Sequence, residues 1–397
     1  MAGFADVTAV AAALMALLTL QAPAARSDGF DAEYARFTDG RVYSRDVKTG
    51  ALQRRHGAYA YWLVVPATYD PAKRYQVRFQ LHGGVMREDS SLRGDGSVRL
   101  AGAEQIYIMP AGWNAAPWWS DAQVASLRAI LEDVKREYNV DENRVVVSGV
   151  SDGGTGAFYV AMRDTTTYAS FLPLNGYVLV LRNPDLDIRG SLFLNNLRNK
   201  PLYVVNGGKD PLYPIDAVEP SVVFMRMAGI PIVYRPRVEA GHDTSWWPAL
   251  REDLETFVRT HPRAPLPDTL TWEVSETRTW NRAHWLIVDA LGTTPGDAKL
   301  DDLNVSGEGR IFPNGKSGRV DIVRAGNVVT ASTRGVTEFT LLLSPDQFDF
   351  ARNVVVRVNG RVAFDARVEK SVETLRKWAS RDNDRTMLFG AEIKIRP

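Results

Sequence analysis

The stretch Arg144-Val145-Val146-Val147-Ser148-Gly149-Val150-Ser151-Asp152-Gly153-Gly154 decides the fold of this chain. Its first five residues are rich in β-branched valine and predict a short buried strand. Residues 157–163 follow with apolar side chains at helical spacing. A strand, a sharp turn centred on serine and then a helix form the context of the G-x-S-x-G nucleophile elbow. We therefore predict that Ser151 is a nucleophile, held exposed on a strained turn.

Two backbone elements are predicted to form an oxyanion hole near this serine. The N–H of Asp152 lies at a helix N-terminus, where it can face a developing negative charge. Further upstream, the predicted strand 75–81 runs into the turn His82-Gly83-Gly84-Val85. Glycines in such a turn let N–H groups face the substrate oxygen without an intervening Cβ. The sequence leaves open whether Gly84 or Val85 donates, and we interpret the histidine of this turn as structural.

Candidates for the acid and the base follow Ser151 in the order acid, then histidine. Asp210 comes 59 residues after the serine, just past the predicted strand 201–206. His242 comes 32 residues after Asp210 and follows a predicted strand over 232–238. A serine hydroxyl is a weak nucleophile until an imidazole takes its proton, and the imidazole needs a carboxylate to fix its tautomer. Asp216 is the alternative acid.

These motifs resemble those of secreted bacterial serine hydrolases with the α/β-hydrolase fold. The similar groups are the polyhydroxybutyrate depolymerase and feruloyl esterase type and the prolyl-oligopeptidase-like esterases. The residues that carry the resemblance are His82-Gly83-Gly84, Asp141-Glu142-Asn143-Arg144-Val145, Gly149 to Gly154, Asp210 and Gly241-His242. The resemblance covers residues 51–261 and implies a Ser-Asp-His triad of Ser151, Asp210 and His242, but no particular substrate.

The length of 397 residues predicts more than one domain. Strands alternating with helices over 40–261 predict a doubly wound, mostly parallel sheet with helices on both faces. A proline-rich linker, 262–268, follows. Residues 269–397 carry short strands separated by turns, which predict a smaller all-β, sandwich-like C-terminal domain. This domain either packs against the hydrolase or binds a glycan or polymer. The candidate platforms are Trp272, Trp280 and Trp285.

Composition and the N-terminus limit the partners. A formal net charge of +1 gives no reason to expect a nucleic acid. The chain has no cysteine, and we expect no metal ion and no cofactor. The apolar run 7–20, followed by Ala22-Pro23-Ala24, predicts a signal peptide over 1–25. We therefore expect a secreted or periplasmic protein without stable membrane association after cleavage. An uncleaved anchor or a wrongly assigned start are the alternatives.

Tryptophans gather in two loops that follow predicted strands, at Trp113, Trp118 and Trp119 and again at Trp246. They predict an aromatic substrate-binding groove, with a packed structural loop as the alternative. We expect a carboxylic-ester hydrolase that acts through an acyl-enzyme on a small-molecule or polymeric ester. The alternatives are a serine peptidase of the prolyl-oligopeptidase-like type and a non-catalytic hydrolase-like binding protein.

Overall fold

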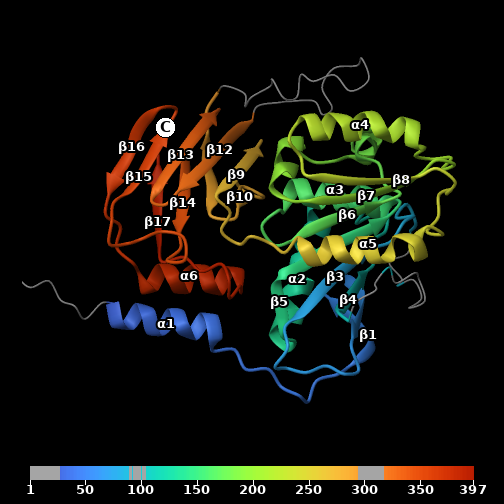
Figure 1. Ribbon diagram of the computed structural model, residues 1–397, viewed down its shortest axis with the longest axis horizontal. Coiled ribbons are helices and arrows are strands. Elements are labelled where there is room, and N and C mark those ends of the chain that lie inside the picture. Colours follow the sequence, from blue (N-terminus) through green and yellow to red (C-terminus); the bar gives the residue numbers. More distant parts are fainter. Residues whose placement is uncertain (1–26, 89–91, 93–99, 101–103, 294–316) are drawn as a thin grey trace, which may run out of the picture.

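The computed structural model describes residues 27–88, 92, 100, 104–293 and 317–397. The predicted signal peptide lies outside these residues. The described chain forms two bodies that lie side by side, a sheet covered by helices and a smaller β-rich body (Figure 1).

The larger body is built on an eight-stranded sheet with the order β1-β2-β4-β3-β5-β6-β7-β8. Its strands are β1 (Gly50–His56), β2 (Tyr59–Val65), β3 (Tyr75–Leu81), β4 (Ile106–Pro110), β5 (Val140–Val150), β6 (Ser170–Leu174), β7 (Leu202–Gly207) and β8 (Ile232–Arg237). The pairs β1–β2 and β2–β4 are antiparallel, and all other neighbours are parallel. This strand order confirms the predicted α/β-hydrolase fold.

Alternate residues of the central strands pack against helices on opposite faces of this sheet. On one face, Val145 and Val147 of β5 belong to the core formed with α2 (Asp121–Glu137), α3 (Asp152–Arg163) and α4 (Ile215–Met227). On the other face, Val146 packs in a smaller core with α5 (Trp247–Thr260). A strand that is buried on both faces reads as a continuous apolar run, which explains the valine-rich stretch before Ser151.

The second body is a sandwich of two sheets. One sheet has the order β10-β11-β14-β17 and the other β16-β15-β13-β12-β9. Their strands are β9 (Thr269–Val274), β10 (Arg282–Ala283), β11 (Leu286–Leu291), β12 (Gly318–Ala325), β13 (Val328–Arg334), β14 (Val336–Leu343), β15 (Val354–Val358), β16 (Arg361–Ala366) and β17 (Ala391–Ile395). The strands β15 and β16 form a hairpin whose turn residues Asn359 and Gly360 both have positive φ angles, 49° and 83°. Helix α6 (Val372–Asp382) precedes β17.

The helix α1 (Ser27–Asp39) packs on this second body although it comes first in the sequence (Figure 1). Phe30 lies in a small apolar cluster with Leu375 of α6 and with Leu388. Lys370 forms an ion pair of 2.8 Å with Asp31. The chain therefore passes between the two bodies twice, once after α1 and once through the linker 262–268.

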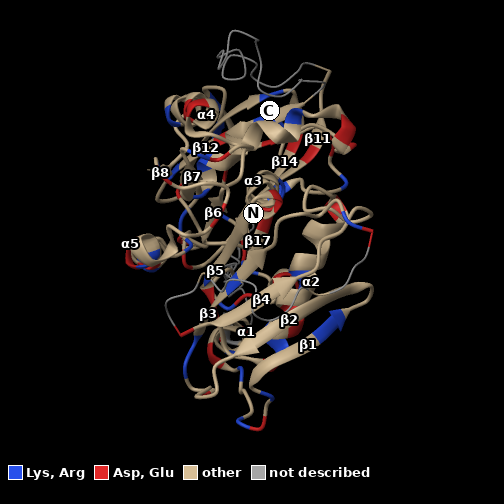
Figure 2. Cartoon of the chain, turned by 90° about the vertical axis from the view of Figure 1, so that its right-hand side faces the viewer, with Lys and Arg blue, Asp and Glu red and all other residues tan. Residues whose placement is uncertain are grey.

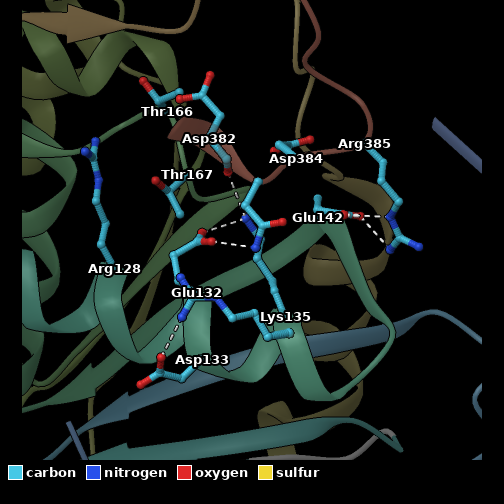
Figure 3. A network of polar contacts seen from close by, with 12 residues as sticks. Arg128, Glu132, Asp133, Lys135, Glu142, Thr166, Thr167, Asp382, Asp384 and Arg385 are labelled. Atoms are coloured by element: carbon cyan, nitrogen blue, oxygen red, sulfur yellow. Dashed lines mark hydrogen bonds and ion pairs between the residues drawn. The ribbon is translucent and has the colours of Figure 1, made fainter. Parts of the chain in front are cut away.

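Buried ion pairs connect the two bodies where they meet, a region that we call the seam (Figure 3). Arg385 of the second body donates to both carboxylate oxygens of Glu142, at 2.7 and 2.9 Å. Arg263 belongs to the linker, yet its side chain is buried and forms an ion pair of 2.6 Å with Asp384. The linker is thus held in the seam and does not act as a free spacer.

Two buried basic side chains, Lys200 and His284, lie among these ion pairs. Burial lowers the pKa of Lys200 well below its usual value, and the nearby Arg263 lowers it further. Burial likewise lowers the pKa of His284, with the charges of Lys200 and Arg263 adding to the effect. The seam therefore contains a lysine and a histidine whose protonation is opposed by their surroundings.

The tryptophans of the second body do not form a binding platform. Trp272 and Trp285 are fully buried in the sandwich core. Trp280 is partly buried at the seam, where its indole N–H donates to Asp121 of α2 at 2.8 Å. Trp272 and Trp285 are therefore core residues of the sandwich, and Trp280 contacts the larger body.

Charges of both signs are distributed over both bodies (Figure 2). In this view, basic and acidic residues of the described part of the chain lie interspersed. Within the described residues, every helix is too short or too polar to cross a membrane.

Candidate active site

Ser151 stands at the sharp turn between β5 and α3. Its backbone has φ 59° and ψ −120°, a conformation that side-chain-bearing residues rarely adopt. A Cβ on Gly149 would lie 2.0 Å from the carbonyl oxygen of Gly153, and a Cβ on Gly153 would lie 2.1 Å from that of Leu81. Only glycines permit this close approach of strand and helix. The sequence GVSDG therefore folds into the predicted elbow.

The three predicted triad residues come together at the carboxyl edge of the sheet. His242 Nε2 lies 2.8 Å from Ser151 Oγ, and His242 Nδ1 lies 2.7 Å from Asp210 Oδ2. Asp210 is buried, and its other oxygen accepts hydrogen bonds from the N–H groups of Leu212 and Tyr213. These bonds fix the carboxylate while it orients the imidazole.

The alternative acid, Asp216, is in the first turn of α4, whereas the imidazole of His242 contacts Asp210.

The loop that carries His242 is hydrogen-bonded to the residue after β6. The side-chain amide of Asn175 donates to the carbonyl oxygen of Asp243 at 2.6 Å, and its backbone N–H donates to Val205 at 2.7 Å. Asn175 has a positive φ of 46°. We expect this contact to set the height of the histidine above the sheet.

The predicted oxyanion turn packs directly against the serine. A Cβ on Gly83 would lie 2.8 Å from Ser151 Cβ, so this position also requires glycine. Gly84 is exposed and has a positive φ of 66°. The N–H of Val85 donates to the carboxylate of Asp152 at 2.9 Å. Of the two candidate donors in this turn, the N–H of Val85 therefore already donates to a protein acceptor.

His82 has the structural role predicted for it. Its Nε2 accepts the N–H of Gly112 at 3.0 Å, so its Nδ1, 2.8 Å from the carbonyl oxygen of Gly83, must carry the proton. The carbonyl oxygen of His82 accepts the indole N–H of Trp118 at 2.7 Å. These bonds connect the oxyanion turn to the loop after β4.

The predicted aromatic groove needs correction. Trp118 is fully buried: a Cβ on Gly156 would lie 2.3 Å from its Cβ, and one on Gly112 2.7 Å from its ring. Trp246 is 3% exposed and packs in the core with α5. Trp119 is 4% exposed and lines a cavity of about 340 Å³ together with Tyr159. Trp113 is partly buried beside Tyr59. For Trp118 and Trp246, the packed structural loop is the correct interpretation.

Four further side chains lie near the triad or adjoin its loops in sequence, and the sequence analysis does not select them. The ring of Tyr213 meets that of His242 edge-on with centroids 5.7 Å apart, and Tyr177 lies 5.9 Å from Tyr213. Met86 and Leu212 are 71% and 59% exposed and directly follow residues of the oxyanion turn and the acid loop. Their closeness in sequence to Val85 and Asp210 is the signal that could have identified them.

The part of the chain that the structure describes contains no group of three histidine, aspartate or glutamate side chains that could hold a metal ion.

Burial raises the pKa of Tyr213, and the charges of Asp152 and Asp210 raise it further, so its phenol stays protonated.

Similarity to curated proteins points to feruloyl esterases. Probable feruloyl esterase C of Aspergillus terreus is 27% identical over 168 residues, which are 40% of this chain and 61% of that protein. Probable feruloyl esterase C of Aspergillus niger is 31% identical over 159 residues, which are 37% of this chain and 57% of that protein. The matches thus span less than two thirds of these relatives. They confirm the resemblance to the feruloyl esterase type. No protein-family model matches the chain.

Solved structures with similar folds are more distant. A ferulic acid esterase has 19% identity and a TM-score of 0.41, and the match covers 53% of this chain and 98% of that one. An acylaminoacyl peptidase of Pyrococcus horikoshii has 14% identity and a TM-score of 0.42, with 55% of this chain and 43% of that one covered. At this level of similarity neither structure bears on what the chain does.

Proposed function

We propose that the chain is a serine hydrolase that cleaves carboxylic esters through an acyl-enzyme. The observation that carries this proposal is the continuous contact from Asp210 through His242 to Ser151, with distances of 2.7 and 2.8 Å. A buried carboxylate, an imidazole and a serine on a strained turn form the arrangement that activates a hydroxyl for attack on an acyl carbon.

In the first half of the reaction, Ser151 Oγ attacks the ester carbonyl carbon while His242 Nε2 takes its proton. The carbonyl oxygen becomes an oxyanion, which the N–H groups of Asp152 and Gly84 stabilise. We assign Gly84 rather than Val85 because the N–H of Val85 is bonded to a carboxylate. His242 then returns the proton to the leaving alcohol oxygen as its bond to the acyl carbon breaks.

In the second half, a water molecule replaces the alcohol. His242 takes a proton from this water, whose oxygen attacks the acyl carbon of the ester formed with Ser151. The same two N–H groups stabilise the second oxyanion. When it collapses, the bond to Ser151 Oγ breaks, His242 gives the proton back to that oxygen, and the carboxylic acid leaves.

We propose an ester of an aromatic acid as the substrate. The curated relatives are named for feruloyl esters. The ring of Tyr213 meets that of His242, and Tyr177 contacts Tyr213. The exposed apolar side chains Met86 and Leu212 adjoin the oxyanion turn and the acid loop in sequence. An aromatic acyl group can bury against such side chains with few polar groups to satisfy. The half-buried Trp113, and Trp119 through its cavity, remain candidates for further contacts.

A panel of model substrates tests this function. We expect turnover of methyl ferulate and of short acyl esters, and little or none of aminoacyl amides. Faster cleavage of the amides than of the esters would favour the serine peptidase. Absence of any turnover together with binding of an ester would favour the non-catalytic alternative.

We further propose the division into the catalytic domain 40–261, the linker 262–268 and the β domain 269–397, with export directed by residues 1–25. N-terminal sequencing of the protein released by the producing cells tests the export. A mature chain that starts shortly after Ala24 would agree with it, and a chain that keeps residues 1–25 would refute it.

A further inference from the structure

The turn 82–85 must hold its shape for the oxyanion to be stabilised, and its two ends are fixed in different ways. The first half is held by the hydrogen bonds of His82 to Gly83 and Gly112 and by the indole N–H of Trp118. The second half is held through Val85, whose side chain is buried and whose N–H is bonded to Asp152.

Asp152 connects this second half to the nucleophile itself. Its backbone directly follows Ser151 at the start of α3, and its Oδ2 accepts the N–H of Val85 at 2.9 Å. Asp152 therefore contributes its N–H to the predicted oxyanion hole, and its side chain holds Val85 on the other side of that hole. The oxyanion mechanism does not by itself require a carboxylate at this position.

The carboxylate has a cost as well as a benefit. A negative charge beside a developing oxyanion opposes that oxyanion by like-charge repulsion. Donation from Val85 and a place in the first turn of a helix both stabilise this carboxylate, because each sets partial positive charge beside it. A side chain that only began α3 would not need to contact Val85 in the turn.

We propose that the side chain of Asp152 is a positioning residue for the oxyanion hole. By engaging Val85 N–H it fixes the turn at the distance from Ser151 at which Gly84 N–H meets the oxyanion. This inference rests on the proposed function. The proposed role needs the hydrogen bond from Val85 N–H and not the negative charge. A neutral side chain of the same length with an acceptor oxygen should therefore fulfil it.

Two neutral variants separate the effect of the side-chain length at position 152 from the effect of its negative charge. Asp152→Asn keeps an acceptor oxygen at the length of the native side chain. Asp152→Ser is equally neutral and suits the first turn of a helix, but its hydroxyl is too short to reach Val85. We expect Asp152→Ser to lose roughly 10- to 100-fold in kcat with KM little changed, as for a reacting group misplaced by about an ångström, and Asp152→Asn to lose markedly less.

Affinity for a trifluoromethyl ketone provides the second measurement. Ser151 Oγ adds to its carbonyl carbon and leaves an oxyanion, so its inhibition constant reports the oxyanion hole. We expect this constant to rise in Asp152→Ser by the same factor as kcat falls. Labelling by a fluorophosphonate, carried to completion, gives the fraction of active sites in each variant, to which kcat is normalised.

Several results would overturn the proposal. Wild-type kcat and inhibitor affinity in Asp152→Ser would show that the hydrogen bond has no role. Equal losses in Asp152→Asn and Asp152→Ser would show that the charge matters and the reach does not. A wild-type protein without turnover and without labelling would instead refute the proposed function.

Discussion

Removing Arg385 should destabilise the whole protein, because this residue joins the two bodies in a buried site. Its side chain is 5% exposed and that of Glu142 is 1% exposed. Arg385 donates to both oxygens of Glu142, to Asn139 Oδ1 at 2.9 Å and to the carbonyl oxygen of Val140. The variant Arg385→Met keeps much of the volume and removes all of these donors.

The size of the effect follows from what the variant leaves behind. Glu142 remains as a buried carboxylate, with Arg41 3.7 Å away and partly exposed. Breaking a buried pair by removing one partner costs about 3–5 kcal/mol. Because Arg41 compensates part of the charge, we expect a loss of about 3 kcal/mol in the free energy of unfolding.

Urea unfolding followed by tryptophan fluorescence and by circular dichroism measures this loss. The double variant Glu142→Met with Arg385→Met removes both charges and should recover most of the stability. Lys377→Met breaks the exposed pair with Glu392, whose side chains are 53% and 38% exposed, and should cost at most about 1 kcal/mol. A loss below about 1 kcal/mol in Arg385→Met, or a double variant less stable than the single one, would refute this reasoning.

Three further predictions concern other parts of the molecule. Burial lowers the pKa of His284 in the folded state, so the unfolded chain binds more protons, and the free energy of unfolding should fall as the pH drops below about 6.5. The variant His284→Gln should make this fall smaller, which urea midpoints measured from pH 8 to pH 5 would show. The lowered pKa of Asp384 acts in a separate window, because its contribution is lost only as the pH falls below about 3.8. Gly149→Ala should reduce kcat/KM by about 100-fold or more, since its methyl group would meet the backbone of Gly153 at 2.0 Å; an active variant would contradict the close approach. Trp118→Ala should cost about 3–5 kcal/mol of stability and impair bulky and short esters alike, whereas a loss confined to bulky esters would restore the aromatic groove.

Much of the fold could be predicted because local sequence patterns and tertiary burial agree. The observed bounds of β3 are those predicted, 75–81. The elbow could be predicted because it needs glycines at fixed positions around a serine, a requirement visible in a single stretch of sequence.

Other elements were missed because their local signal is weak. The strand β1 lies at the sheet edge and alternates between partly buried and exposed residues, so it has no apolar run. The strand β6 reads Ser-Phe-Leu-Pro-Leu and lacks β-branched residues. Helix α1 has few apolar residues, and its partner α6 lies more than 300 residues away.

The tryptophan groove failed for a different reason. Loop tryptophans were interpreted as exposed because loops usually lie at the surface. Trp118 is buried because Gly112 and Gly156 leave room for its ring, and that contact joins the loop to α3. The seam was equally invisible, since the pairing of Arg385 with Glu142 joins residues 243 positions apart.

The proposed chemistry depends most directly on which side chain becomes acylated and on what activates it. Wild-type protein and the variants Ser151→Ala and His242→Ala would be treated with a fluorophosphonate, digested and mapped by mass spectrometry. We predict one modified residue, Ser151, in the wild type, no modification in Ser151→Ala, and strongly slowed modification in His242→Ala. Modification of another residue, or labelling of His242→Ala at the wild-type rate, would contradict the proposed mechanism.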